Sequence, residues 1–164
     1  MRNRQRLCGE VRLPLHPPEF DAALFDFAKF EIDDGRFNEA LAILEDARLL
    51  RPDPPLLLRM EFLSAHAHYL AKQFDTATAD FEQIAQTDSH LAKAALFNAS
   101  SGWLQVGNHT RFVADYDQLE RQGEDEQSRA DLRLEEGLMQ AAKADKRAAG
   151  SLQRFIRRRL QKRS

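Results

Sequence analysis

The sequence is poor in the residues that build several common classes of protein. It contains one cysteine, Cys8, among 164 residues, so a disulfide within the chain is impossible and a cysteine-based metal site is not expected. Its uninterrupted apolar runs are only a few residues long, too short to span a bilayer. The basic N-terminal stretch lacks the apolar core of a secretory signal. We therefore expect a cytoplasmic protein by default, and a cell-envelope setting stays open if the chain is a segment of a longer protein.

Motifs that carry catalysis are lacking as well. The sequence has no glycine-rich phosphate loop, no nucleophile elbow and no HExxH metal motif. His66 and His68 are two residues apart, about 200° around a helix, so they cannot hold one metal ion from one face. The acidic run at 124–126 is expected at a helix start, where the helix dipole favours carboxylates. We predict that the protein is not an enzyme and uses no cofactor or metal ion.

Charge is distributed unevenly along the chain. Residues 21–143 carry 12 Lys or Arg against 23 Asp or Glu, whereas residues 144–164 carry eight Lys or Arg against one acid. An acidic body is therefore followed by a basic tail. Six of the eight cations lie in the last stretch, 151–164, namely Arg154, Arg157, Arg158, Arg159, Lys162 and Arg163.

The basic tail has three possible roles. Apolar residues at 152, 155, 156 and 160 would share one face of a helix, which favours a last helix of the fold held against the acidic body. Contact with an anionic membrane surface is an alternative. Binding of nucleic acid is a further alternative, disfavoured because no aromatic platform for bases accompanies the arginines.

Helical periodicity runs through nearly the whole chain, and no stretch shows convincing strand alternation. The apolar faces are interrupted at Gly35, near Gln73, at Gly107–Asn108 and near Asp145. These breaks predict a poorly ordered basic leader followed by four helical hairpins, the last of them a capping pair with a basic end. The leader covers residues 1–18, and the hairpins cover about 19–52, 55–88, 89–123 and 125–162.

The hairpins recur at a nearly constant interval. Aligned on Ala40, Ala77, Phe112 and Ala148, they follow one another at steps of 37, 35 and 36 residues, which is typical of a solenoid. Small residues also recur, because Ala28, Ala65 and Ser100 share one register on the first helices, as Ala40 and Ala77 do on the second. We expect these small side chains to lie where two helix backbones approach closely.

This pattern resembles the tetratricopeptide repeat over roughly residues 20–160. The second copy carries Ala65, Ala77 and Phe81, with Ser89 where the family has proline, and the third has Phe112 in place of an alanine. The resemblance implies an all-α, right-handed α-solenoid of three to four hairpins. It also implies a non-catalytic scaffold, a chaperone-like adaptor of bacterial type, that holds a partner polypeptide in a concave groove. The first copy matches the repeat at Leu24, Phe27, Ala28, Gly35, Ala40, Leu44, Ala47 and Pro52.

If the resemblance holds, the first helices line the groove. Phe25, Phe62 and Phe97 occupy one register there, either as an aromatic stripe of the groove or as part of the core. The clamp for a chaperone's terminal carboxylate is not expected, because only Asn98 fits its pattern. The other candidate groove residues are Lys29, Arg59, His66, Tyr69, Asn98, Ser101, Gln105 and Arg133.

Two rival functions remain beside the peptide groove. In the first of them, the chain is a self-associating segment of a larger repeat array. In the second it binds an anionic membrane or nucleic acid through its basic C-terminal helix. The expected partner in the main hypothesis is another protein or peptide.

Overall fold

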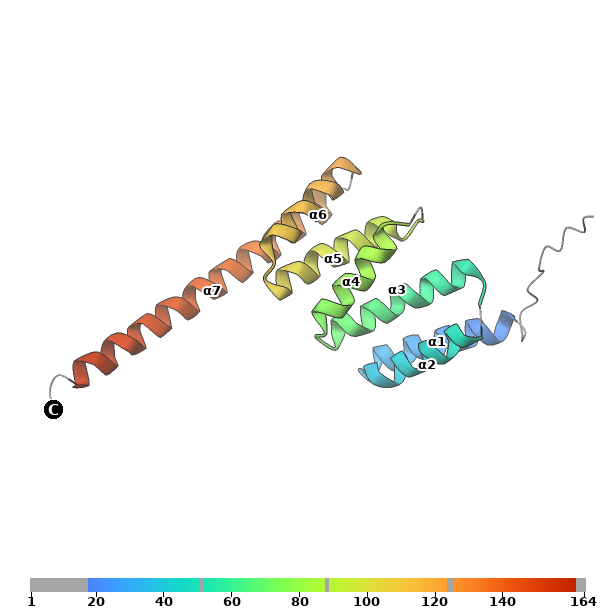
Figure 1. The fold of residues 1–164 in the computed structure, drawn as a ribbon, viewed down its shortest axis with the longest axis horizontal. Coiled ribbons are helices and arrows are strands. Elements are labelled where there is room, and N and C mark those ends of the chain that lie inside the picture. Colours follow the sequence, from blue (N-terminus) through green and yellow to red (C-terminus); the bar gives the residue numbers. More distant parts are fainter. Residues whose placement is uncertain (1–17, 51, 88, 124–125, 162–164) are drawn as a thin grey trace, which may run out of the picture. The chain divides into compact units, whose positions relative to one another are not determined.

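The computed structural model describes residues 18–50, 52–87, 89–123 and 126–161 (Figure 1). Every element in these ranges is a helix and none is a strand, so the all-α class predicted from the sequence is confirmed. Clustering of contacts divides the chain at Ala67–His68, inside the third helix, into two compact units. The helices are α1 (Pro18–Asp33), α2 (Phe37–Leu49), α3 (Pro54–Leu70), α4 (Phe74–Ala85), α5 (Ala92–Val106), α6 (His109–Arg121) and α7 (Glu126–Gln161).

The helices are joined in pairs by one repeated turn. In each pair the second helix begins two residues after a residue with positive φ, namely Gly35 (76°), Lys72 (62°) and Gly107 (83°). At each of these turns two backbone N–H groups donate back to the preceding helix, as from Lys72 to Tyr69 and from Gln73 to His68. These two hydrogen bonds satisfy carbonyls that would otherwise be left free at the helix end. The breaks expected at Gly35, near Gln73 and at Gly107–Asn108 are therefore confirmed.

The turn at Lys72 yields a first prediction. A side chain at positive φ is unfavourable, and glycine removes that cost, so we expect Lys72→Gly to raise the free energy of unfolding by about 0.5–1 kcal/mol. Gly35→Ala is the matched opposite change at the equivalent turn, and we expect it to destabilise by a similar amount although nothing crowds its Cβ. Urea unfolding measures both. Destabilisation by Lys72→Gly would contradict this account of the turn.

Two small apolar clusters stabilise the described part of the first unit, which runs up to Ala67. Ala28, Leu44, Ala47 and Met60 form one of them, from α1, α2 and α3. The other comprises Ile32, Ala40 and Ala67. The predicted close-approach residues of this unit, Ala28, Ala40 and Ala65, are all fully buried. Asp53 starts α3 by accepting the Leu56 N–H at 2.8 Å, and Pro54 at the first helical position has no N–H to satisfy.

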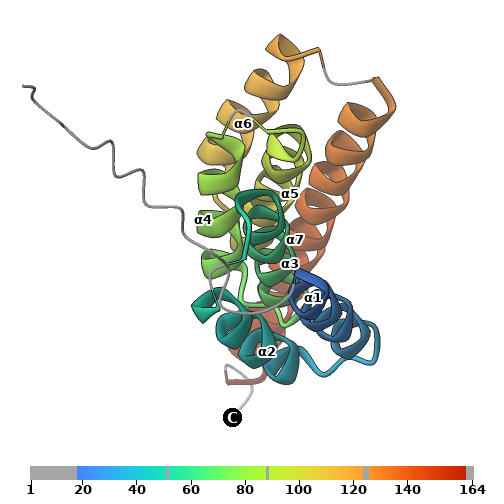
Figure 2. The same cartoon turned by 90° about the vertical axis from the view of Figure 1, so that its right-hand side faces the viewer.

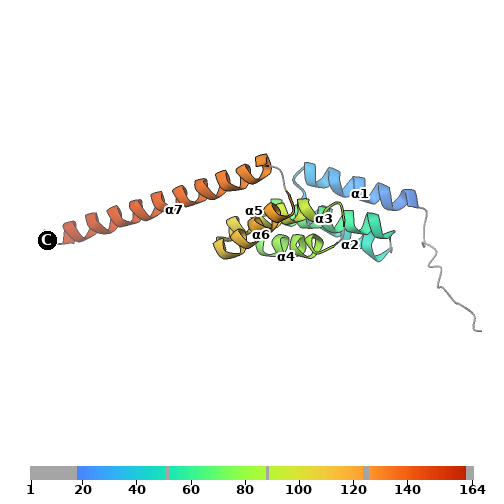
Figure 3. The ribbon, with the colours of Figure 1, turned by 90° about the horizontal axis from the view of Figure 1, so that it is seen from above.

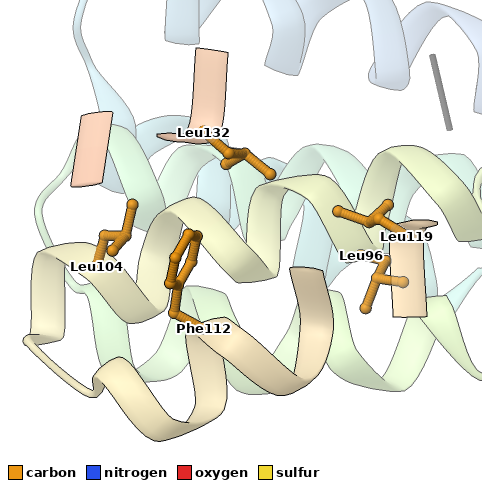
Figure 4. Packing of buried hydrophobic residues seen from close by; sticks show 5 residues of the cluster. All are labelled: Leu96, Leu104, Phe112, Leu119 and Leu132. Atoms are coloured by element: carbon orange, nitrogen blue, oxygen red, sulfur yellow. The ribbon is translucent and has the colours of Figure 1, made fainter. Parts of the chain in front are cut away.

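The second unit packs α4, α5 and α6 side by side (Figure 2). An apolar cluster of this unit brings together residues of α5, α6 and α7 (Figure 4). Ser100 and Ala77 are fully buried, as expected of their register. At Gly102 a Cβ would lie 2.3 Å from Thr78 Oγ1, so α4 and α5 approach so closely that only glycine fits. The cluster comprises Leu96, Leu104, Phe112, Leu119 and Leu132.

Helix α7 corrects the predicted fourth hairpin. It runs for 36 residues without a break at Asp145, so the repeat ends in one long helix instead of a capping pair. The stretch around Asp145 is rich in alanine, lysine and arginine, which favour helix, and it holds no proline that would stop one. Figures 1 and 3 show the second half of α7 projecting beyond α5 and α6.

Glu136 anchors the first half of α7 to its neighbours. The side chain is mostly buried, lies 3.2 Å from His109 Nδ1 and accepts from Arg133 Nη1 at 3.0 Å. Leu132, one turn earlier, enters the apolar cluster with 1% of its surface exposed. These two residues determine the rotation of α7 about its axis, and hence which of its side chains meet α5.

Candidate functional site

Four polar side chains of the second unit form one hydrogen-bonded network, here called the Glu135 network. Ser101 Oγ, in the middle of α5, donates to both carboxylate oxygens of Glu135 on α7, at 2.9 and 3.1 Å. Gln105 Nε2, one turn further along α5, donates to Glu135 Oε1 at 2.7 Å. Tyr69, in the last turn of α3, places its hydroxyl 2.8 Å from Ser101 Oγ. The network thus joins three helices through Tyr69, Ser101, Gln105 and Glu135.

The direction of these hydrogen bonds follows from the chemistry of the groups. An ionised carboxylate only accepts, so the single Ser101 proton points to Glu135, and the Tyr69 hydroxyl must donate to Ser101. Burial raises the pKa of Tyr69, the Ser101 bond lowers it in part and the Glu135 charge raises it, so the phenol stays protonated at neutral pH. All four side chains remain partly exposed. Lone pairs on the Glu135 carboxylate are therefore open to a donor from solvent or from a partner.

Glu135 was not predicted from the sequence, and Arg133 was predicted in its place. The Arg133 guanidinium instead stacks on the Tyr116 ring, 4.0 Å from its centroid, against α6. Its pKa is raised, chiefly by the hydrogen bond to Glu136. Residues two positions apart on a helix point in directions about 200° apart around its axis, so Arg133 and Glu135 cannot face the same neighbour. The spacing of 34 residues between Ser101 and Glu135 was the available signal.

In the first unit, the structure brings together two of the predicted groove residues. Arg59 on α3 lies over the Phe25 ring on α1, 4.4 Å from its centroid, a cation–π geometry. Phe25 is half-buried and also packs against the apolar cluster of this unit. Lys29 is exposed on α1. On α3, burial lowers the pKa of His66, although nearby Asp33 acts in the opposite direction, so the imidazole is neutral at neutral pH.

The three phenylalanines of the predicted stripe share an intermediate environment. Phe25, Phe62 and Phe97 are each partly buried, and Phe25 and Phe97 pack against core clusters. The rings of Phe25 and Phe97 therefore combine apolar contact with some exposed surface. Phe97 and Asn98 also line an open hollow of about 550 Å³. Its other lining residues are His90, Lys93, Ala94, Gly123 and Ser128.

The tail cations are not part of the described site. Lys162 and Arg163 lie outside the described residues. Helix α7 extends to Gln161, but the structure does not describe the side chains of Arg154, Arg157, Arg158 and Arg159.

A second polar cluster, which the sequence did not predict, links α4, α5 and α6. Glu82 accepts from Trp103 Nε1 at 3.0 Å and pairs with Arg111 at 2.9 Å, and the guanidinium lies 5.0 Å from the Trp103 ring centroid. Asp115 lies one turn beyond Arg111, and its buried Oδ2 accepts no hydrogen bond within the described part of the chain. Burial first, and then the Glu82 charge, raise the pKa of Asp115 to about 6, against a smaller lowering by Arg111.

The raised pKa of Asp115 predicts a pH-dependent loss of stability. Between pH 4 and 6 the folded state keeps a proton that the unfolded state has released, so stability falls as pH rises through this range. A shift of about two units is at most about 3 kcal/mol, and solvent screening at this partly exposed site reduces it to about 1–2 kcal/mol. We expect Asp115→Asn to be more stable than the wild type at pH 8 by that amount.

Thermal unfolding of the two proteins at several pH values tests this prediction. The gain of Asp115→Asn should shrink to a small fraction of its pH 8 value at pH 4, where the wild-type carboxyl is protonated in the folded state and about half protonated in the unfolded state. Asp117→Asn is a matched control on the exposed surface of α6, and we expect no such pH-dependent difference for it. An equal gain at pH 4 and pH 8 would show that the charge of Asp115 is not its cause.

The described residues contain neither a metal cluster nor a membrane span. Within the described ranges, no group of three or more His, Cys, Asp or Glu side chains is placed to hold a metal ion. None of the described helices combines the length and the apolar character needed to cross a bilayer. No protein-family model matches the chain, and no significant match was found among curated proteins or solved structures.

Proposed function

We propose that this protein is a non-catalytic scaffold of tetratricopeptide type that binds a partner polypeptide along its first helices. In this proposal the hairpins α1–α2, α3–α4 and α5–α6 stack as a right-handed solenoid and α7 closes its end. The repeated turn at Gly35, Lys72 and Gly107 supports a repeat of one structural unit.

One observation carries the proposal. Side chains from the predicted groove register connect consecutive first helices within each unit. Phe25 of α1 meets Arg59 of α3 in the first unit, and Tyr69 of α3 meets Ser101 of α5 in the second. Ser101 in turn meets Glu135 of α7. In a solenoid, such contacts occur where the first helices form one continuous surface.

The chemistry of this surface suits a peptide. In the second unit, the Glu135 carboxylate offers acceptor sites to backbone N–H groups or to a lysine or arginine of the partner. In the first unit, the partly exposed Phe25 ring and the Arg59 guanidinium offer apolar and stacking contacts. A few such anchors typically give about micromolar affinity, roughly −8 kcal/mol.

The test is peptide selection followed by a single isosteric change. Peptides would be selected from a random phage-displayed library on the wild-type protein and measured again on Glu135→Gln. Loss of a charge-assisted hydrogen bond costs about 1.5–3 kcal/mol, so we expect affinity to fall by roughly tenfold to a hundredfold. Glu135→Gln keeps the side-chain shape, so we expect circular dichroism and thermal stability to change little.

A matched control separates the groove from general charge. Glu39 is exposed on α2, so Glu39→Gln removes the same charge away from the network and should leave peptide binding unchanged. If the selected peptides bound Glu135→Gln as tightly as the wild type, the Glu135 network would not be the binding surface. Selection of no peptide at all would count against the scaffold itself.

A further inference from the structure

Helix α1 carries an apolar face that the first unit leaves uncovered. Phe27 and Phe30 are 51% and 54% exposed, although large apolar side chains of a small helical unit are normally packed. Ala23, also exposed, lies one turn before Phe27 on the same side. Ala23, Phe27 and Phe30 follow the spacing i, i+4, i+7 of one helical face, here called the Phe27 patch.

An acidic row borders the Phe27 patch. Glu19, Asp26 and Asp33 are seven residues apart along α1, so they lie in one line, and all three are exposed. The guanidinium of Arg36 lies 5.7 Å from the Phe30 ring centroid, at the far end of the patch, but it is paired with Glu31 and Asp34. Lys29 is also exposed beside this row, so three carboxylates and one ammonium group leave the charge next to the aromatic patch net negative. A basic amphipathic helix is the natural complement of such a surface.

The chain itself contains such a helix. The described contacts of α7 with α5 and α6 lie between Arg129 and Lys143, and the helix continues to Gln161. At 1.5 Å per residue the projecting part is about 25 Å long. Residues 144–164 carry eight Lys or Arg against one acid, with apolar residues at 152, 155, 156 and 160.

We propose that the Phe27 patch of one molecule binds the basic C-terminal end of α7 from a second copy. Leu152, Phe155, Ile156 and Leu160 supply the apolar spacing that matches Ala23, Phe27 and Phe30, and the surrounding arginines meet the acidic row. The two surfaces differ, so the contact is heterologous and joins molecules head to tail into a ring or an open chain. This association is independent of the proposed peptide groove.

The test uses full-length variants and sedimentation velocity over a range of protein concentrations. We expect the wild type to associate with increasing concentration, and less so at high salt, because screening weakens the charge attraction. Phe27→Asp should weaken association by about tenfold or more, and so should the double variant Arg157→Glu/Arg158→Glu. Leu49→Asp, which alters a residue of α2 that is 69% exposed, is the matched control and should associate like the wild type.

Mixing the two defective variants gives the decisive result. Phe27→Asp retains an intact basic end, and the double variant retains an intact Phe27 patch, so together they should form a one-to-one dimer and nothing larger. Circular dichroism confirms that each variant is folded. A strictly monomeric wild type, or an equimolar mixture that stays monomeric while the wild type associates, would overturn the proposal. So would a wild type that remains monomeric and instead binds anionic phospholipid vesicles through its basic end.

Discussion

Replacing Phe112 by alanine is expected to cost about 3–5 kcal/mol of the free energy of unfolding. Phe112 occupies the repeat position where Ala40 and Ala77 stand in the first two hairpins, so the substitution makes the third copy like the first two at this position. The ring is nevertheless fully buried between α5, α6 and α7 (Figure 4). It also contacts Tyr116, at 5.9 Å between ring centroids. Alanine there would leave a cavity that the surrounding helices cannot fill.

The measurement is denaturant unfolding of Phe112→Ala and Phe112→Leu. Leucine keeps much of the apolar volume, so we expect it to lose clearly less stability than alanine. The converse change, Ala77→Phe, should also destabilise, because Ala77 is fully buried in a register shaped for a small side chain. If Phe112→Ala left the free energy of unfolding unchanged, the helices of the third hairpin would be able to approach each other as closely as those of the first two hairpins.

The second large effect is expected at Gly102, where α4 and α5 are in closest approach. A Cβ on Gly102 would lie 2.3 Å from Thr78 Oγ1 and 3.4 Å from Thr78 Cβ, so the two helices must move apart. Thr78 is fully buried, and its hydroxyl donates to the Phe74 carbonyl at 2.6 Å, which leaves it no free direction to turn. We expect Gly102→Ala to destabilise by about 1–3 kcal/mol, even though alanine is the better helix former.

Three further variants isolate this contact, namely Gly137→Ala, Thr78→Ala and the double variant Gly102→Ala/Thr78→Ala. Gly137 lies in α7, where an added Cβ would meet no other atom within 4 Å, so Gly137→Ala should stabilise by up to about 1 kcal/mol. Thr78→Ala removes the obstructing hydroxyl and methyl groups, so the double variant Gly102→Ala/Thr78→Ala should recover part of the loss. Unfolding midpoints of the wild type, Gly102→Ala, Thr78→Ala and the double variant test the steric explanation. Purely additive effects of the two substitutions would refute the steric explanation.

Much of the helical framework follows from local sequence. Gly35 and Gly107 take positive φ at the turns where the break in periodicity placed them. The small residues Ala28, Ala40, Ala65, Ala77 and Ser100 are fully buried, as their recurrence predicted. Each of these features depends on a few neighbouring residues: a backbone conformation that favours glycine, or a side chain small enough for a close contact.

The candidate site was predicted only in part. Tyr69, Ser101 and Gln105 belong to one network, and Phe25 lies against Arg59. The acid at the centre of that network, Glu135, was missed, because the rotation of α7 about its axis, which turns Glu135 and not Arg133 toward Ser101, depends on packing against other helices. The ion pair of Glu82 with Arg111 was missed for another reason. Its members are 29 residues apart, on two helices that no local pattern relates.

By itself, the sequence determined where the turns within the first three hairpins lie and which of their positions stay small, since backbone preference and hydrophobic period act within a few residues. Only the tertiary structure decided how α7 is rotated about its axis. It also decided that the repeat position of Ala40 and Ala77 accommodates the large side chain of Phe112 in the third hairpin. Burial of Leu132 and Glu136 against α5 and α6 turns Glu135 toward Ser101 and leaves Arg133 over Tyr116. A rotation about a helix axis changes no local interaction, so packing against neighbouring helices must select it.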